Sequence, residues 1–192
     1  MRKIRLFLAV NLPDEVKKNI SGLRESLANV PLDSTWVKEE NLHLTIKFFG
    51  EVNVDLVSAI VATIQSATAA IVPFQISFSG LGYFPNSKRP RIFWAGIKGQ
   101  VNELVDLHKK LELALSPLGF PPEGRSYSPH LTIFRLRSQR GVGLLKKVVG
   151  KKNKENIELG NLTVNSVELM QSQLTPRGPV YTVIDSFRLL GM

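Results

Sequence analysis

The tetrapeptide His43-Leu44-Thr45-Ile46 occurs a second time as His130-Leu131-Thr132-Ile133, 87 residues further along the chain (130 − 43). A looser echo pairs Arg5-Leu6-Phe7-Leu8-Ala9 with Arg91-Ile92-Phe93-Trp94-Ala95, at an offset of 86 residues (91 − 5). Because the two offsets agree to one residue, the segments between the echoes have nearly the same length. The sequence therefore predicts two halves built on one plan.

Between these echoes the chain alternates helical and strand-like patterns. Leu104, Leu107 and Leu111 recur at helical spacing, and Pro117 and Gly119 end that run. We expect helices over residues 13–27, 55–71, 101–115 and 141–149, and strands at both echoes and over residues 74–81, 157–174 and 180–190. This mixture predicts an α+β fold of two similar lobes with pseudo-twofold symmetry, in which antiparallel-rich sheets line a central cleft and helices pack outside.

The domain organisation follows from the repeat and from the lack of a long linker. The junction between the halves falls at residues 85–90, a short segment bracketed by prolines. We expect residues 1–192 to form a single domain with lobes over about 1–85 and 91–192, and strands exchanged between them.

Composition narrows the function classes. Lys and Arg outnumber Asp and Glu by 25 to 16, so the net charge of +9 favours an anionic partner such as nucleic acid. The absence of cysteine excludes disulfides, cysteine-ligated zinc and a thiol nucleophile, and fits a cytoplasmic protein. No apolar run approaches the roughly 18 residues that span a bilayer, so we expect no membrane segment.

The repeated motif has two faces. On a strand, His43 and Thr45 point to one side while Leu44 and Ile46 point to the other, and the second motif repeats this arrangement. If the lobes pack symmetrically, two imidazoles and two hydroxyls face each other. One imidazole can act as a base and the other as an acid in the cleavage of a phosphodiester, and the threonine hydroxyls can bind the non-bridging oxygens.

The same histidines allow other interpretations. A strand histidine can be merely hydrogen-bonded, but the repetition of the motif argues against that for the pair. A zinc site would need further ligands, and no cysteine, helical His-Glu spacing or third motif histidine supplies them, so we expect no metal and no cofactor. His108 has no counterpart in the other half, and we expect it to be structural or solvated.

The sequence resembles the LigT-like branch of the two-histidine phosphoesterases over nearly its whole length. The resemblance is carried by the segments Arg5 to Phe7, Asn41 to Gly50 and Pro129 to Arg135, with Gly82 to Pro85, Arg89 to Trp94 and Tyr181 as further landmarks. It implies hydrolysis of an RNA 2′,3′-cyclic phosphate to a 2′-phosphomonoester, and a reverse 2′–5′ RNA ligase activity known in parts of the family. It also implies that His43 donates the proton to the leaving 3′ oxygen and that His130 accepts the proton of water.

Further substrate contacts are predicted beside the motifs. Arg135 matches a family position, but strict alternation places it on the face opposite His130. Lys47 and Phe134 each share a strand face with a motif histidine, so Lys47 could meet a phosphate and Phe134 could narrow the cleft or stack on a base. Phe7 and Tyr127 are further candidates for stacking. The lysines of residues 146–154 are interpreted as a solvated surface.

Two other functions stay open at the level of sequence. One is a non-catalytic module that binds RNA ends or nucleotides, and the other is a cyclic phosphodiesterase that acts on small nucleotides. The expected partners are RNA with 2′,3′-cyclic phosphate ends or small cyclic nucleotides, and the chain is expected to be a monomer.

Overall fold

The computed structural model describes residues 2–191, which form nine strands, four α-helices and three short 3-10 helices. The strands are β1 (Lys3–Asn11), β2 (Ser34–Trp36), β3 (His43–Asn53), β4 (Phe74–Phe84), β5 (Ile92–Gly99), β6 (Leu131–Leu136), β7 (Glu158–Val164), β8 (Ser166–Thr175) and β9 (Gly178–Arg188). The helices are α1 (Asp14–Ser26), α2 (Val57–Ala69), α3 (Val101–Leu115) and α4 (Val142–Lys154), and the 3-10 helices are Glu39–Asn41, Val54–Leu56 and Ser116–Leu118.

Two antiparallel sheets carry the repeat. One has the strand order β3-β1-β8-β9, and the other has the order β2-β6-β5-β4-β7. Apart from β2 the orders correspond, with β3 and β1 of the first sheet matching β6 and β5 of the second. In each sheet the strand beside this pair comes from the other half of the chain, since β8 pairs with β1 and β4 pairs with β5. The predicted α+β fold of two similar lobes is confirmed.

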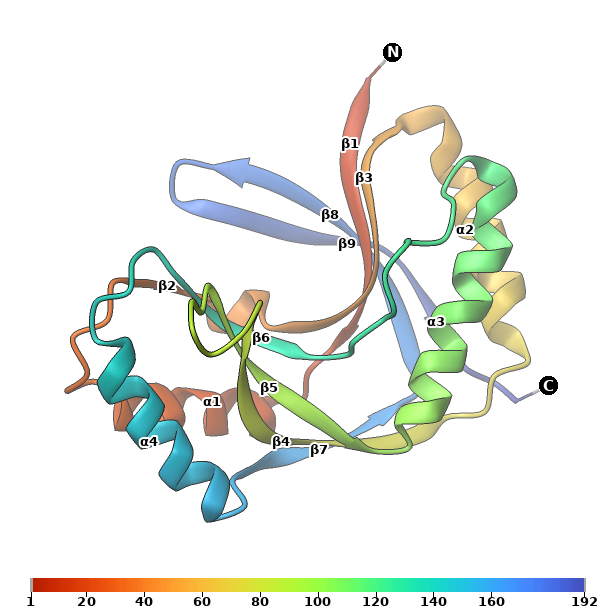
Figure 1. The fold of residues 1–192 in the computed structure, drawn as a ribbon. Coiled ribbons are helices and arrows are strands. Elements are labelled where there is room, and N and C mark those ends of the chain that lie inside the picture. The colour runs from red at the N-terminus through yellow and green to blue at the C-terminus, as the bar shows by residue number, and fades with distance from the viewer. Residues whose placement is uncertain (1, 192) are drawn as a thin grey trace.

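Helices cover the sheets on their outer faces (Figure 1). α2 and α3 pack together and contact the first sheet, while α1 and α4 contact the second. Amphipathic spacing explains these contacts, because Leu104, Leu107 and Leu111 of α3 all point inward and are buried. After α3 the chain turns at Gly119, whose φ of 89° is a left-handed conformation that favours glycine. None of the helices within residues 2–191 is long and apolar enough to cross a membrane.

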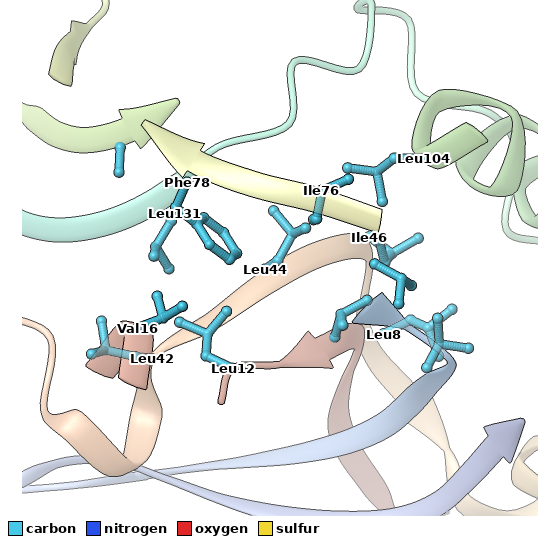
Figure 2. Packing of buried hydrophobic residues seen from close by; sticks show 14 of the residues in the cluster. Leu8, Leu12, Val16, Leu42, Leu44, Ile46, Ile76, Phe78, Leu104 and Leu131 are labelled. Atoms are coloured by element: carbon cyan, nitrogen blue, oxygen red, sulfur yellow. The ribbon is translucent and has the colours of Figure 1, made fainter. Parts of the chain in front are cut away.

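One hydrophobic core joins the two lobes. Leu44 and Ile46 of β3 lie in the same buried cluster as Leu131 of β6 and Phe78 of β4. Figure 2 shows Leu44 directed toward Phe78 and Ile76 from the strand that carries the first motif. Each fully buried leucine or isoleucine contributes about 1.5–3 kcal/mol. The inward half of each motif therefore fixes the strand that presents the outward half.

The looser sequence echo is misaligned by one residue in the structure. Leu8 pairs with Lys47 in the first sheet, and its counterpart Phe93 pairs with Phe134 in the second, an offset of 85 residues (93 − 8) rather than 86. Phe7 consequently lies on the face opposite the main core, whereas Phe93 is inside it. The echo identifies equivalent strands, and cross-strand pairing sets their register.

Candidate active site

His43 is the first residue of β3, and its ring is held in place by neighbours. Its Nδ1 lies 2.7 Å from the carbonyl oxygen of Asn41, and its ring packs against Phe7 and Tyr181 at centroid distances of 4.8 and 5.4 Å. A carbonyl oxygen can only accept, so Nδ1–H is the donor and Nε2 is the nitrogen left for chemistry. Burial lowers the pKa of His43 below its ordinary 6.5, and the hydrogen bond to Asn41 partly offsets this.

His130 lies immediately before β6 and has the same kind of anchor. Its Nδ1 donates to the carbonyl oxygen of Ser128 at 2.8 Å. The rings of Phe84 and Trp94 contact it edge-on, with centroids 4.8 and 6.4 Å away. Each motif histidine thus bonds the carbonyl two residues before it, and each keeps Nε2 free. The two imidazoles are presented in the same tautomer by equivalent backbone geometry.

Several contacts connect the two motifs across the lobes. The Tyr127 hydroxyl, three residues before His130, donates to the backbone carbonyl of Thr45 at 2.8 Å. β3 and β6 also contact each other directly. Burial raises the pKa of Tyr181, and the positive charges of Arg135 and Arg5 counteract the rise. These contacts bring the segments that carry the two motifs next to each other.

Thr45 and Thr132 lie on the same strand faces as the histidines that precede them. Thr45 pairs with Ala9 and Thr132 with Trp94 in the sheet registers, and both side chains are partly exposed. Within residues 2–191, neither hydroxyl has a hydrogen-bond partner in the protein. Both hydroxyls are free to donate to oxygens of a bound phosphate.

A β-bulge lies at the last residue of each motif. In the first sheet Ala9 pairs with Thr45 and Leu8 with Lys47, so Ile46 is passed over. In the second sheet Trp94 pairs with Thr132 and Phe93 with Phe134, so Ile133 is passed over. An extra residue in one strand reverses the alternation of all side chains beyond it. Residues after the bulges therefore lie on the face opposite to the one that strict alternation predicts.

Lys47 is not a substrate contact, contrary to the prediction. The bulge turns its side chain inward, where it is 3% exposed. Its Nζ forms an ion pair with Glu112 of α3 and donates to the carbonyl oxygen of Pro121 at 3.3 Å. Lys47 joins β3 to α3 and to the loop after it.

Phe134 and Arg135 exchange the faces that the sequence suggested. Phe134 is fully buried, with its ring 4.5 Å from those of Phe93 and Trp36, so the prediction that it narrows the cleft or stacks on a base is wrong. Arg135 is exposed on the side of Thr132, so the expectation that it lies opposite His130 is also wrong. The same bulge causes both changes.

Phe48 was missed by the sequence reasoning. Its side chain is 59% exposed, and its ring centroid lies 6.2 Å from that of Phe7. It follows the first motif at the position that Arg135 occupies after the second, since both lie five residues beyond the motif histidine. The repeat contained this signal, but only the bulge shows that the position faces the site.

Phe7 and Tyr127 lie beside the site, and each ring packs against other aromatic rings. Phe7 is 3% exposed and packs against His43 and Tyr181. Tyr127 stacks on His108 at 4.0 Å with rings nearly parallel, in addition to its bond to Thr45. Both residues therefore contact the motifs directly, through the His43 ring and the Thr45 carbonyl. His108 is buried where it stacks on Tyr127.

The rest of the described chain offers no alternative centre. Within residues 2–191, no three His, Asp or Glu side chains gather as metal ligands would. Two surface hollows of about 510 and 540 Å³ lie between α2 and α3 and between α1 and β2, and neither is lined by a motif histidine. The candidate site is therefore sought at the paired histidines.

Comparison with known families gives two consecutive matches. The family described as LigT like Phosphoesterase matches residues 10–94 and again residues 97–181. Each match contains one motif histidine, which agrees with the duplicated plan of the sheets.

Curated relatives and solved structures cover nearly the whole chain. A protein of Methanothermobacter thermautotrophicus is 36% identical over 187 residues, covering 97% of this chain and 100% of the relative. A protein of Methanocaldococcus jannaschii is 35% identical over 181 residues, covering 94% and 98%. Both are named RNA 2′,3′-cyclic phosphodiesterase. The crystal structure of TT0787 of Thermus thermophilus has a TM-score of 0.79 at 26% identity, covering 98% and 99%. Escherichia coli LigT complexed with 3′-AMP has a TM-score of 0.78 at 23% identity with the same coverage, and supports the fold.

Proposed function

The chain belongs to the LigT-like phosphoesterase family, and from that membership we propose that it hydrolyses the 2′,3′-cyclic phosphate at an RNA end to a 2′-phosphomonoester. The observation that carries the proposal is the matched presentation of two imidazoles. Both histidines donate Nδ1–H to the carbonyl two residues back, so both keep Nε2 for proton transfer. The names of the full-length relatives supply the substrate class.

In the proposed reaction a water molecule attacks phosphorus and the P–O3′ bond breaks. The water proton passes to Nε2 of His130, and Nε2–H of His43 gives its proton to the departing O3′. The family resemblance, rather than the geometry, assigns which histidine is the acid. Each proton transfer of this kind contributes roughly 10²–10⁴ in rate. 2′–5′ ligation would use the same two groups in the same roles, because a 5′-hydroxyl would replace water, give its proton to His130 and attack phosphorus, while His43 protonates the departing O3′.

The remaining side chains of the site stabilise charge. Thr45 and Thr132 would donate to the non-bridging oxygens, and Arg135 would add a positive charge on the same face. Burial lowers the pKa of His43 in the free protein, which disfavours the protonated form that an acid needs. A bound phosphodiester anion next to the ring opposes that shift, because a nearby negative charge favours imidazolium. Substrate binding and protonation of His43 are thus coupled.

The test is a product assay in EDTA with an oligonucleotide that ends in a 2′,3′-cyclic phosphate. We expect a 2′-phosphate product, and we expect His43→Ala and His130→Ala each to lose at least about a hundredfold in kcat. Because two groups that act as a unit are not additive, the double variant should lose little more than either single variant. Thermal unfolding of each variant checks that the fold is retained.

Three experimental outcomes would contradict the proposed function. Salt-dependent RNA binding without product would leave a module that binds RNA ends. Turnover of cyclic mononucleotides alone, with no product from any oligonucleotide, would limit the substrate to small nucleotides. Activity that disappears in EDTA and returns with a divalent ion would end the metal-independent scheme.

A further inference from the structure

Two hydrogen bonds hold three loop segments together at the end of the second sheet, beyond Arg135. The Gln139 side chain donates to the carbonyl oxygen of Pro90 at 3.0 Å, which joins the β6–α4 turn to the β4–β5 loop. The Arg137 amide donates to the carbonyl oxygen of Asp33 at 2.9 Å, which joins the same turn to the segment before β2. Figure 1 shows these segments on the β2 side of the molecule.

These connections gather exposed cations, which we call the basic rim. The rim comprises Lys88 and Arg89 of the β4–β5 loop and Arg137 and Arg140 of the turn before α4. Within residues 2–191, none of these four side chains forms an ion pair with a carboxylate. Their positive charge is therefore not neutralised by the protein.

The rim continues a line that starts at the site. The bulge at Ile133 puts Arg135 on the face of Thr132, and Arg137 follows two residues later, just beyond the end of β6. Arg137 Nε donates to the Thr35 hydroxyl at 2.9 Å, and Thr35 pairs with Arg135 across β2 and β6. This bond holds the guanidinium beside Arg135 and leaves its other donors free.

The segment that leads into His130 is not basic. The segment of residues 121–128, which leads into His130, contains one acidic and one basic side chain, Glu123 and Arg125. A polyanion bound at the histidines is therefore attracted toward the rim rather than toward this segment.

We propose that the RNA strand on the 5′ side of the cyclic phosphate runs from the histidines past Arg135 onto the basic rim, where Arg137 and Arg140 bind its backbone phosphates. The inference rests on the proposed function and deepens it by assigning a longer RNA, rather than a mononucleotide, as the preferred substrate. Guanidinium groups suit this role because their paired donors match phosphate oxygens. No base is read by these contacts, so binding is independent of sequence.

The test compares two variants that lose the same charge. Arg137→Gln/Arg140→Gln removes two rim cations, and Lys147→Gln/Lys154→Gln removes two exposed lysines of α4, which has no site residue. The value of kcat/KM is measured for a ten-nucleotide RNA with a 2′,3′-cyclic end and for a 2′,3′-cyclic mononucleotide. The ratio of the two values should fall about tenfold or more in the rim variant and stay at the wild-type ratio in the lysine variant.

Salt dependence gives a second readout. Each phosphate contact on a single strand contributes about 0.7 to the slope of log K against log salt, so two lost contacts should flatten the slope by about 1.4. The slope is measured by the binding of a fluorescent ten-nucleotide RNA that ends in a 2′-phosphate, which needs no turnover. If the wild type hydrolyses neither substrate, the proposed function fails while this binding arm still tests the rim. An unchanged ratio and slope in the rim variant, or equal losses in both variants, would overturn the proposal.

Discussion

The buried ion pair between Lys47 and Glu112 gives a prediction that separates a structural role from substrate contact. The two side chains are 3% and 4% exposed, and Glu112 also accepts a hydrogen bond from the Glu123 amide. Removing one partner of such a pair leaves a buried charge uncompensated and costs about 3–5 kcal/mol. For a chain of this size that loss corresponds to a melting temperature lower by about 6–20 °C. Lys47→Met should show this loss.

A double variant and a surface control sharpen the test. Lys47→Met/Glu112→Met removes both charges and should cost only about 1–2 kcal/mol, mainly for the Glu123 amide left without its acceptor. The exposed pair of Lys38 and Glu40, 3.8 Å apart, provides the control, and Lys38→Met should change stability by less than about 1 kcal/mol.

Urea unfolding at neutral pH gives the free energy of unfolding of the wild type and the three variants. The value of kcat/KM is measured at a temperature where each variant is folded. The double variant should lie closer in stability to the wild type than Lys47→Met does. A Lys47→Met protein of wild-type stability with a much lower kcat/KM would refute the structural assignment, and would return Lys47 to the role of a phosphate contact.

Three other predictions concern the site. Burial lowers the pKa of His43, and an acid must start in its protonated form. In a pH–rate profile, kcat/KM should therefore fall by about tenfold per pH unit above that lowered pKa. A value of kcat/KM that rises with pH in that range would make His43 the base. We expect a base to stack on the exposed Phe48 ring, so Phe48→Ala should lower kcat/KM by a factor equivalent to about 1–3 kcal/mol, and should change the free energy of unfolding by less than about 0.5 kcal/mol because the side chain is 59% exposed. Gly82→Ala would place a Cβ against the Trp94 ring, which contacts His130, so this variant should have a lower kcat and a free energy of unfolding lower by about 1–3 kcal/mol. Gly124→Ala is the control, because no atom lies within 4 Å of its Cβ, and it should change neither quantity.

The fold class and both motifs could be predicted from the sequence because those features are local or repeated. Leu44 and Ile46 alternate with His43 and Thr45, and burial of the first pair dictates exposure of the second. The repeat at 87 residues then required an equivalent strand in the second half. Nothing beyond side-chain periodicity and self-similarity was needed for this part of the structure.

The faces of Lys47, Phe134 and Arg135 were beyond sequence reasoning because a bulge is a property of strand pairing. Ile46 and Ile133 are passed over only because β1 and β5 meet the motif strands in a particular register. A continuous apolar run such as Ile133-Phe134 is compatible with either alternation or a bulge. The burial of Phe134 beside Phe93 decides between them, and that contact joins residues far apart in the chain.

The duplication also raises the question of how two equivalent histidines could do unequal work. Their Nδ1 anchors are the same, so the backbone gives neither ring a preference for acid or base. The neighbours differ: His43 packs between Phe7 and Tyr181, and the position five residues after each histidine is Phe48 in one lobe and Arg135 in the other. Only one lobe therefore places a cation on the site face just after its motif, so the electrostatic potential at one imidazole differs from that at the other. Because protonation responds to nearby charge and to burial, the residues that break the repeat, rather than the motif itself, are what can set the two imidazoles in different protonation states.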